Sequence, residues 1–272
     1  MHLTIIKNGE TIDHRTLGVK LLSFKKSSLT HINEYDSAEG RHGLISLGTT
    51  FDGRKLSASF LIDAVDHLDY QLKKDIVYNL FSTEDEMILI DSRQPGKQWK
   101  VKVESDFEVE NVSFCAGSFE VEFISSFPYS ESIGTTLDPL TFDSNLWQIG
   151  QGLSGEDVQY IHNTTSFSIY NAGDVKIDPR TMPFVIQYTG ASGGLEIENL
   201  TNGDKWTYSD ASNTSDTILI GVNGIRSTKN NLSIVSKTNK KLITLDKGNN
   251  QFNITGTNGS FEIKFEFRFY YA

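Results

Sequence analysis

Two glutamates on one predicted strand are the residues best placed to do chemistry. In the stretch LEIENL, Glu196 and Glu198 are two positions apart. Side chains with that spacing lie on the same face of a strand, about 6 to 7 Å apart. Glycoside hydrolysis uses two carboxyl groups about 5 to 10 Å apart. The acidic outer face of an ordinary sheet gives the same pattern, as at Glu120 and Glu122, so a glycosidase and a solvated sheet face both stay open.

A second candidate is the cation-rich stretch DSRQPGKQWKVKV, residues 91–103. A phosphate-binding P-loop needs a longer glycine motif between a strand and a helix. Here Pro95 and Gly96 fit the centre of a type II turn, and an alternating strand follows. That strand has Trp99, Val101 and Val103 on one face and Lys100 and Lys102 on the other. We therefore predict a hairpin with outward lysines.

Trp147 and Trp206 are the aromatic residues most relevant to ligand binding in the second half of the chain. Exposed tryptophans stack on sugar rings in carbohydrate-binding sandwiches. Buried tryptophans would instead pack in the core, and the sequence pattern does not distinguish the two. A weak carbohydrate contact at these rings is one hypothesis.

Metal and nucleophile chemistry have little support in the sequence. The six histidines do not show the close spacings of compact metal motifs. Cys115 is the only cysteine, which excludes an intramolecular disulfide, and its apolar surroundings predict a buried structural thiol. The acidic run Glu84 to Glu86 is typical of a solubilising turn, with a weak Ca²⁺ site as the alternative. We predict no catalytic residue, cofactor or metal.

Charge and hydropathy limit the classes of partner. The chain has 272 residues and a net charge of −10, so direct nucleic-acid binding is not expected. Its first residues contain only a short apolar run, interrupted by Lys7, too short for a signal segment or a membrane span. We expect synthesis in the cytoplasm and no membrane insertion.

One segment predicts a helix, and most of the rest predicts strands. Residues 66–82 have Leu68, Leu72, Ile76, Val77, Leu80 and Phe81 at three- and four-residue spacings, and Asp66 can cap the start. Elsewhere apolar residues alternate with polar ones, as in residues 54–62, 117–123 and 261–269. The expected fold is mainly β, with the helix docked on a sheet.

The alternation lapses near Gly134, where we place a boundary. The first predicted domain is 1–133, and the second, 134–272, begins with a connection over about 134–146. Repeated turns and short strands predict a β-sandwich in the second half. In the first half, residues 25–48 are polar and predict an arm that lies on the surface or along a neighbouring subunit.

Several motifs together resemble the distal tail protein (Dit) family of long non-contractile-tailed bacteriophages. In the first half these are GRHG (40–43), FDGRKLSASF (51–60), DYQLKKDIVYNLF (69–81), PGKQWKVKV (95–103) and FPYSESIGTT (127–136). In the second half the resemblance rests on FSIYNAGDVKIDP (167–179), LEIENLTNG (195–203), NNQFNITG (249–256) and the terminal FEFRFYY. The stretch EDEMILI, residues 84–90, departs from the aromatic-containing segment expected after the helix.

The resemblance implies an architecture and a set of partners. The first domain would be a β-sandwich with one docked helix and a belt-like arm, and the second a galectin-like β-sandwich, similar to carbohydrate-binding modules. Six copies would form a hexameric ring at the virion tail tip. The ring would join the major tail tube protein and the tape-measure end to the tail-associated or receptor-binding proteins.

The hub hypothesis also predicts subunit contacts. Cations near the arm and the hairpin, in an otherwise acidic chain, could pair with acidic residues of a neighbouring copy; they are Arg41, Arg54, Lys97, Lys100 and Lys102. The alternative is a carbohydrate-binding module that recognises host cell-wall polysaccharide.

Overall fold

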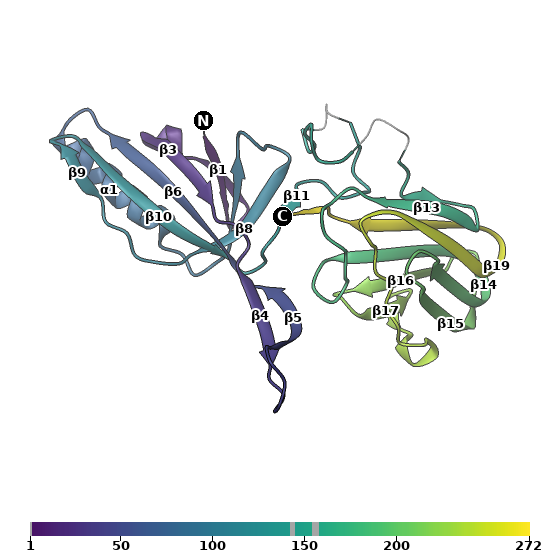
Figure 1. The fold of residues 1–272 in the computed structure, drawn as a ribbon. Helices are drawn as coiled ribbons and strands as arrows, with labels where there is room; N and C mark the ends of the chain where they lie inside the picture. Colours follow the sequence, from purple (N-terminus) through teal and green to yellow (C-terminus); the bar gives the residue numbers. More distant parts are fainter. Residues whose placement is uncertain (1, 142–144, 154–157) are drawn as a thin grey trace. The chain divides into compact units, whose positions relative to one another are not determined.

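Antiparallel strands form most of the chain, together with one α-helix (Figure 1). The computed structural model describes residues 2–141, 145–153 and 158–272. They divide into two compact units, Met1–Ser130 with Ala272, and Glu131–Tyr271. The prediction of a mainly β chain with one docked helix is confirmed.

The first unit contains a sheet with the strand order β2-β1-β7-β8-β10-β6-β3, and β9 also pairs with β10. The strands are β1 (Leu3–Lys7), β2 (Glu10–Asp13), β3 (Val19–Lys26), β6 (Arg54–Asp63), β7 (Met87–Asp91), β8 (Lys97–Val103), β9 (Glu110–Ser113) and β10 (Ala116–Ser125). A 3-10 helix, η1 (His14–Leu17), joins β2 to β3.

The core of this unit follows from period-two alternation. Along β6, every second residue from Arg54 to Ile62 is buried, and β10 buries Phe119, Val121 and Phe123 in the same way. Residues from β1 and β7 belong to the same core cluster. The two parts of the sheet therefore close over one apolar interior, as a sandwich does.

Helix α1 (His67–Phe81) begins where the sequence predicts, because the carboxylate of Asp66 accepts a hydrogen bond from the Asp69 amide at 2.8 Å. Its buried side chains are Tyr70, Val77, Leu80 and Phe81. Phe81 packs against Phe60, Phe119 and Phe123.

The predicted apolar face of this helix is wrong for half of its members. Leu68, Leu72 and Ile76 are exposed, with Leu68 75% and Leu72 64% accessible. The aromatic ring of Tyr70, which the spacing argument left out, takes the buried position. Rotation of the helix toward Tyr70 and Phe81 turns a stripe of leucine and isoleucine to solvent.

Between β3 and β6 the chain forms a separate antiparallel hairpin, β4 (His31–Asp36) and β5 (Ile45–Phe51). These two strands pair only with each other among the described residues. Figure 1 shows the hairpin extending away from the sheet of its own unit. We call residues 31–51 the arm.

The second unit is built on a sheet with the order β12-β19-β14-β16-β17-β18; β13 also pairs with β19, and β15 with β14. The strands are β12 (Ile161–His162), β13 (Ser166–Asn171), β14 (Phe184–Asn199), β15 (Asp204–Ser212), β16 (Thr217–Val222), β17 (Arg226–Lys229), β18 (Leu232–Ser233) and β19 (Gly248–Phe267). Short elements complete the chain: η3 (Val235–Lys237), and β11 (Ser130–Ser132), which pairs with β20 (Tyr270–Tyr271).

Strands β14 and β19 are long, and both are interrupted by register shifts. Gly256 lies at such a point with φ of 79°, and a Cβ there would come within 2.2 Å of the Gly194 carbonyl oxygen. Only glycine allows this approach of two backbones. The shifts let each strand change partners, so that β19 pairs with β13 in its first half and with β12 in its second.

The predicted connection over 134–146 packs onto the second unit. Thr136 is buried and donates to the Phe265 carbonyl at 2.6 Å. Trp147 packs against Phe269 and donates its indole N–H to the Pro139 carbonyl at 2.8 Å. Residues 142–144 of the predicted connection lie outside the described residues.

Candidate interaction surfaces

The arm places apolar side chains in solvent. Ile32, Tyr35, Leu44 and Leu47 are all exposed, and no residue of either arm strand is buried. An isolated two-stranded hairpin is at best marginally stable in water. The arm therefore presents apolar side chains that its own two strands do not cover.

Arg54 fixes the root of the arm. Its Nε donates to the Ser27 carbonyl at 2.8 Å and its Nη1 to the Pro128 carbonyl at 3.4 Å. The guanidinium also lies over the Trp99 ring, 5.1 Å from the centroid, and the residue is only 8% exposed. Burial lowers the pKa of this guanidinium. The predicted pairing of Arg54 with a neighbouring subunit is at odds with this burial, because its donors serve its own unit.

The hairpin between β7 and β8 is formed as predicted, with one correction. The Lys97 amide donates to the Gln94 carbonyl at 3.1 Å, which places Pro95 and Gly96 at the centre of the turn. Gly96 does not have a positive φ, so the turn is not type II. Trp99 and Val101 are buried, whereas Lys100 and Lys102 are exposed.

Two edge strands of the first unit, β3 at one end of the strand order and β9 beside β10, present opposite charges. At one edge, β3 presents Lys20 and Lys25. At the other, the chain leading into β9 presents Asp106, Glu108 and Glu110. Within the described residues these three carboxylates have no ion-pair partner.

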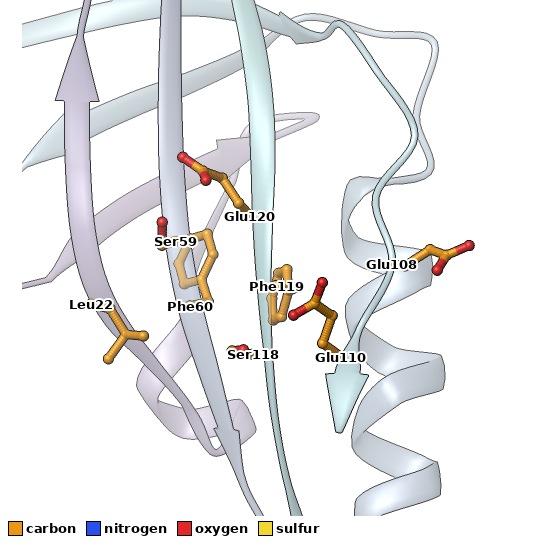
Figure 2. Close-up of a pocket in the computed structure, with 8 residues that line it drawn as sticks. All are labelled: Leu22, Ser59, Phe60, Glu108, Glu110, Ser118, Phe119 and Glu120. Atoms are coloured by element: carbon orange, nitrogen blue, oxygen red, sulfur yellow. The ribbon is translucent and has the colours of Figure 1, made fainter. Parts of the chain in front are cut away.

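A shallow depression of about 330 Å³ lies on the sheet surface between the two edges. Figure 2 shows Leu22 at one rim, on β3, Glu110 at the other, and Glu120 between them beside Ser59, while Glu108 points away. Ser59 and Ser118 form the floor, since their small side chains leave the space open. The residues that line the depression do not form a catalytic arrangement. Its acidic residues come from β10 and from the chain at β9, and none comes from β3.

The start of α1 and the β9 edge form one continuous surface. The Tyr70 hydroxyl donates to Asn111 Oδ1 at 2.6 Å, and the rings of His67 and Phe114 stack at 4.9 Å. Val65, Leu68, Leu72, Val112 and Phe114 are the exposed apolar residues there. Together they are the α1–β9 patch.

A family model matches most of the first unit. Residues 12–125 match the model described as a phage tail protein RIFT-related domain. We refer to the first unit, which holds these residues, as the tail domain. This finding agrees with the motifs of the tail domain that indicated the distal tail proteins.

The whole chain also resembles a solved phage tail protein. It is 13% identical to the SPP1 Dit protein, with a TM-score of 0.70, covering 99% of this chain and 100% of that one. It is 12% identical to a chain of the phage P2 baseplate in its activated conformation, with a TM-score of 0.45 and coverage of 98% and 97%. No curated protein matches the chain. The resemblance to distal tail proteins is confirmed by the family model and by the shared fold.

The other predicted contact cations of the tail domain lie on different surfaces. Arg41 is exposed at the tip of the arm, and Lys97 is half-buried beside the β7–β8 turn. Lys26, which the sequence argument did not select, reaches Gln94 Oε1 at 2.6 Å and lies over the Trp99 ring. Desolvation, followed by the neighbouring Lys97 and Arg54, lowers the pKa of Lys26. Contacts of these cations with another copy stay predictions.

The paired carboxylates of the second unit are joined by a lysine. Lys205 Nζ lies 2.8 Å from Glu196 and 3.5 Å from Glu198. Its hydrogen bond to Glu196, the largest cause, raises the pKa of Lys205. An ion-paired pair on a strand face fits the solvated-surface interpretation better than a glycosidase.

Both tryptophans proposed for sugar contact are buried. Trp147 is 6% exposed and Trp206 is 1% exposed. Trp206 packs beside Tyr208. Neither ring offers a face to a sugar, because the core of the second unit covers both.

The remaining candidates have plain structural positions. Cys115 is half-buried in the β9–β10 turn rather than fully buried. Within residues 2–141, 145–153 and 158–272, no cluster of His, Cys, Asp and Glu could hold a metal ion. In the same part of the chain, no helix is long and apolar enough to cross a membrane.

Proposed function

We propose that this chain is a structural hub of a phage tail tip. The observation that supports this most is the fold shared with the SPP1 Dit protein along the whole of both chains. The structure of that relative is described as a paradigm of the hub adsorption apparatus in phages that infect Gram-positive bacteria. The role is mechanical rather than enzymatic.

In this proposal six copies form a ring through their tail domains. The exposed arm supports assembly, since its apolar side chains have no cover in their own unit. The ring would sit at the virion tail tip after synthesis in the host cytoplasm. It would join the tail tube and the tape-measure end to the tip or receptor-binding proteins during host attachment.

The two tryptophans on which the carbohydrate-binding alternative relied, Trp147 and Trp206, are buried and therefore do not support it. We therefore propose no sugar site in the second unit.

Purified full-length chain tests the proposal directly. Native mass spectrometry over a range of concentrations should give a hexamer, and negative-stain images of the same sample should show sixfold rings. A chain that is monomeric at every concentration and binds cell-wall glycans would contradict the hub and support the alternative.

A further inference from the structure

We propose that copies of this chain join head to tail through two edge strands of the tail-domain sheet, so that β3 of one copy lies beside β9 of the next. The α1–β9 patch would be covered by the same incoming copy. The inference rests on the proposed ring and names the surfaces that close it.

The charges of the two edges are complementary. Lys25 on β3 has no ion pair in the described part of the chain, and Lys20 pairs only with Asp63, on the surface, at 2.6 Å. The β9 edge offers the unpaired carboxylates of Glu108 and Glu110. A two-fold contact would set like edges against each other, whereas a head-to-tail contact brings opposite charges together.

Strand direction agrees with the same contact. β3 is antiparallel to β6, β6 to β10, and β10 to β9, so β9 runs opposite to β3 within one copy. Rotation about a ring axis leaves the direction of each strand along that axis unchanged. β9 would therefore meet the β3 strand of a neighbour in antiparallel orientation. Because the Val19 and Phe24 carbonyls of β3 already accept from His14 and Arg93, the contact depends mainly on side chains.

The apolar surface extends the contact beyond the strands. Phe114 is 76% exposed beside β9, and Leu68 and Leu72 continue the patch along α1. On the opposite edge, Leu22 of β3 is also exposed. Apolar patches flanked by charged residues are typical of protein interfaces.

Charge-swap variants of the full chain test the contact. The acid-edge variant is Glu108→Lys with Glu110→Lys, and the base-edge variant is Lys20→Glu with Lys25→Glu. At low ionic strength each alone should assemble about a hundredfold more weakly than the natural chain, because each now opposes like charges. The four changes in one chain should restore assembly.

Mixing the two single-edge variants gives a sharper outcome. The lysine edge of one variant would meet the glutamate edge of the other at every contact, so an equimolar mixture should form alternating rings. Native mass spectrometry would resolve equal numbers of the two chains after one is isotope-labelled. A symmetric contact between identical edges would also pair the two variants, but it would not let the natural chain or the four-change chain assemble alone.

Controls separate the edges from net charge and from folding. Glu84→Lys with Glu86→Lys, and Lys240→Glu with Lys241→Glu, change the same charges at exposed sites away from both edges and should leave assembly unchanged. Lys25→Glu alone keeps the Lys20–Asp63 pair and should weaken assembly in the same direction if the base-edge variant melts early. Leu68→Ser with Leu72→Ser should also weaken assembly, whereas Leu200→Ser with Leu232→Ser in the second unit should not.

The outcomes separate this inference from the ring. If the natural chain forms a hexamer and each single-edge variant alone forms it equally well, or if the four-change chain fails to restore it, the complementary edges are not the contact and the ring stands. If the natural chain forms another closed oligomer that the swaps break and restore, the edges stand and the hexamer fails. A natural chain that stays monomeric at every concentration overturns both.

Discussion

His14 is a buried histidine that the tail domain holds in its neutral form. It is 1% exposed, and its Nδ1 lies 2.7 Å from the Val19 carbonyl oxygen. The Leu3 amide donates to its Nε2 at 3.2 Å. A carbonyl can only accept, so Nδ1 has the proton and Nε2 is the acceptor. Burial, the largest cause, lowers the pKa of His14 below its ordinary value of 6.5.

This site predicts a loss of tail-domain stability in mild acid. Since the pKa of His14 is lower in the folded state, the unfolded chain binds the proton first as pH falls below 6.5. The stabilisation is complete above that pH and is lost below it, by up to about 1.4 kcal/mol per pH unit until the folded histidine itself titrates. Urea unfolding at several pH values should show this slope.

The control uses the second histidine with a lowered pKa, His162 in the other unit. His14→Gln should reduce the pH dependence of the unfolding free energy of the tail domain, and His162→Gln should leave that pH dependence unchanged. The hydrogen-exchange rate of the Leu3 amide reports on the tail domain alone. Equal slopes in the natural chain and in His14→Gln would refute the assignment.

Asn250 is a polar residue buried in the core of the second unit, as His14 is in the first. It is fully buried, and its Oδ1 accepts from the Asp246 amide at 2.9 Å and from Asn199 Nδ2 at 3.1 Å. Its Nδ2 donates to the carbonyls of Asp246 and Gly248. One side chain thus satisfies the backbone of the turn into β19.

Replacement of Asn250 by Leu should destabilise the second unit by about 2 to 4 kcal/mol, because several buried polar groups lose their partners. The change is measured as a lower denaturant midpoint for that unit. Asn249→Ala, at the exposed neighbouring position, should change the free energy of unfolding by less than about 0.5 kcal/mol. Similar effects of the two variants would show that the buried network adds nothing to stability.

At the scale of elements, the arm is separable from the sheet that holds it. β3 and β6 are paired neighbours, with Lys26 opposite Leu56, so a short turn can join them. Replacing residues 29–52 with a Gly-Asn turn should keep the tail domain folded, since it removes no buried side chain.

The arm deletion should abolish assembly while the thermal midpoint of the tail domain changes by only a few degrees. Native mass spectrometry and a thermal melt of the same sample check both halves of the prediction. The deletion leaves Arg54 and Ser27 in place, so the root contact at 2.8 Å is preserved. A deleted chain that still forms rings would show that the arm has another partner.

The elements also show what a sequence can and cannot predict. Strict alternation located β6 and β10, because residues two apart must share a face. The spacing of apolar residues also located the helix, but it did not predict which face of the helix is buried. The spacing of apolar residues predicts that a stripe of leucines is buried. Tyr70 and Phe81 are buried instead, because Phe81 packs against the Phe60 ring and the Tyr70 hydroxyl bonds to Asn111.

The candidate surfaces depended on contacts that spacing does not contain. Arg54 was expected at a subunit contact, and Trp206 was left open between surface and core; both are buried. The β9 edge was missed because Glu108 and Glu110 look like any acidic outer face until the strand order leaves them at an open edge. Motif order, by contrast, was enough to indicate the tail-protein resemblance.

At the scale of the whole molecule, the two units differ in how much of the chain must be synthesised before each can fold. Strands β1 to β3 and β6 to β10, which enclose the core of the tail domain, all lie before residue 126. The sheet of the second unit depends on β19, whose last residue, Phe267, pairs with Phe184 at the start of β14. During translation the tail domain can therefore close its core before β19 has been made. The start of β14, at Phe184, can pair only after its partner Phe267, more than eighty residues later in the chain, has been synthesised.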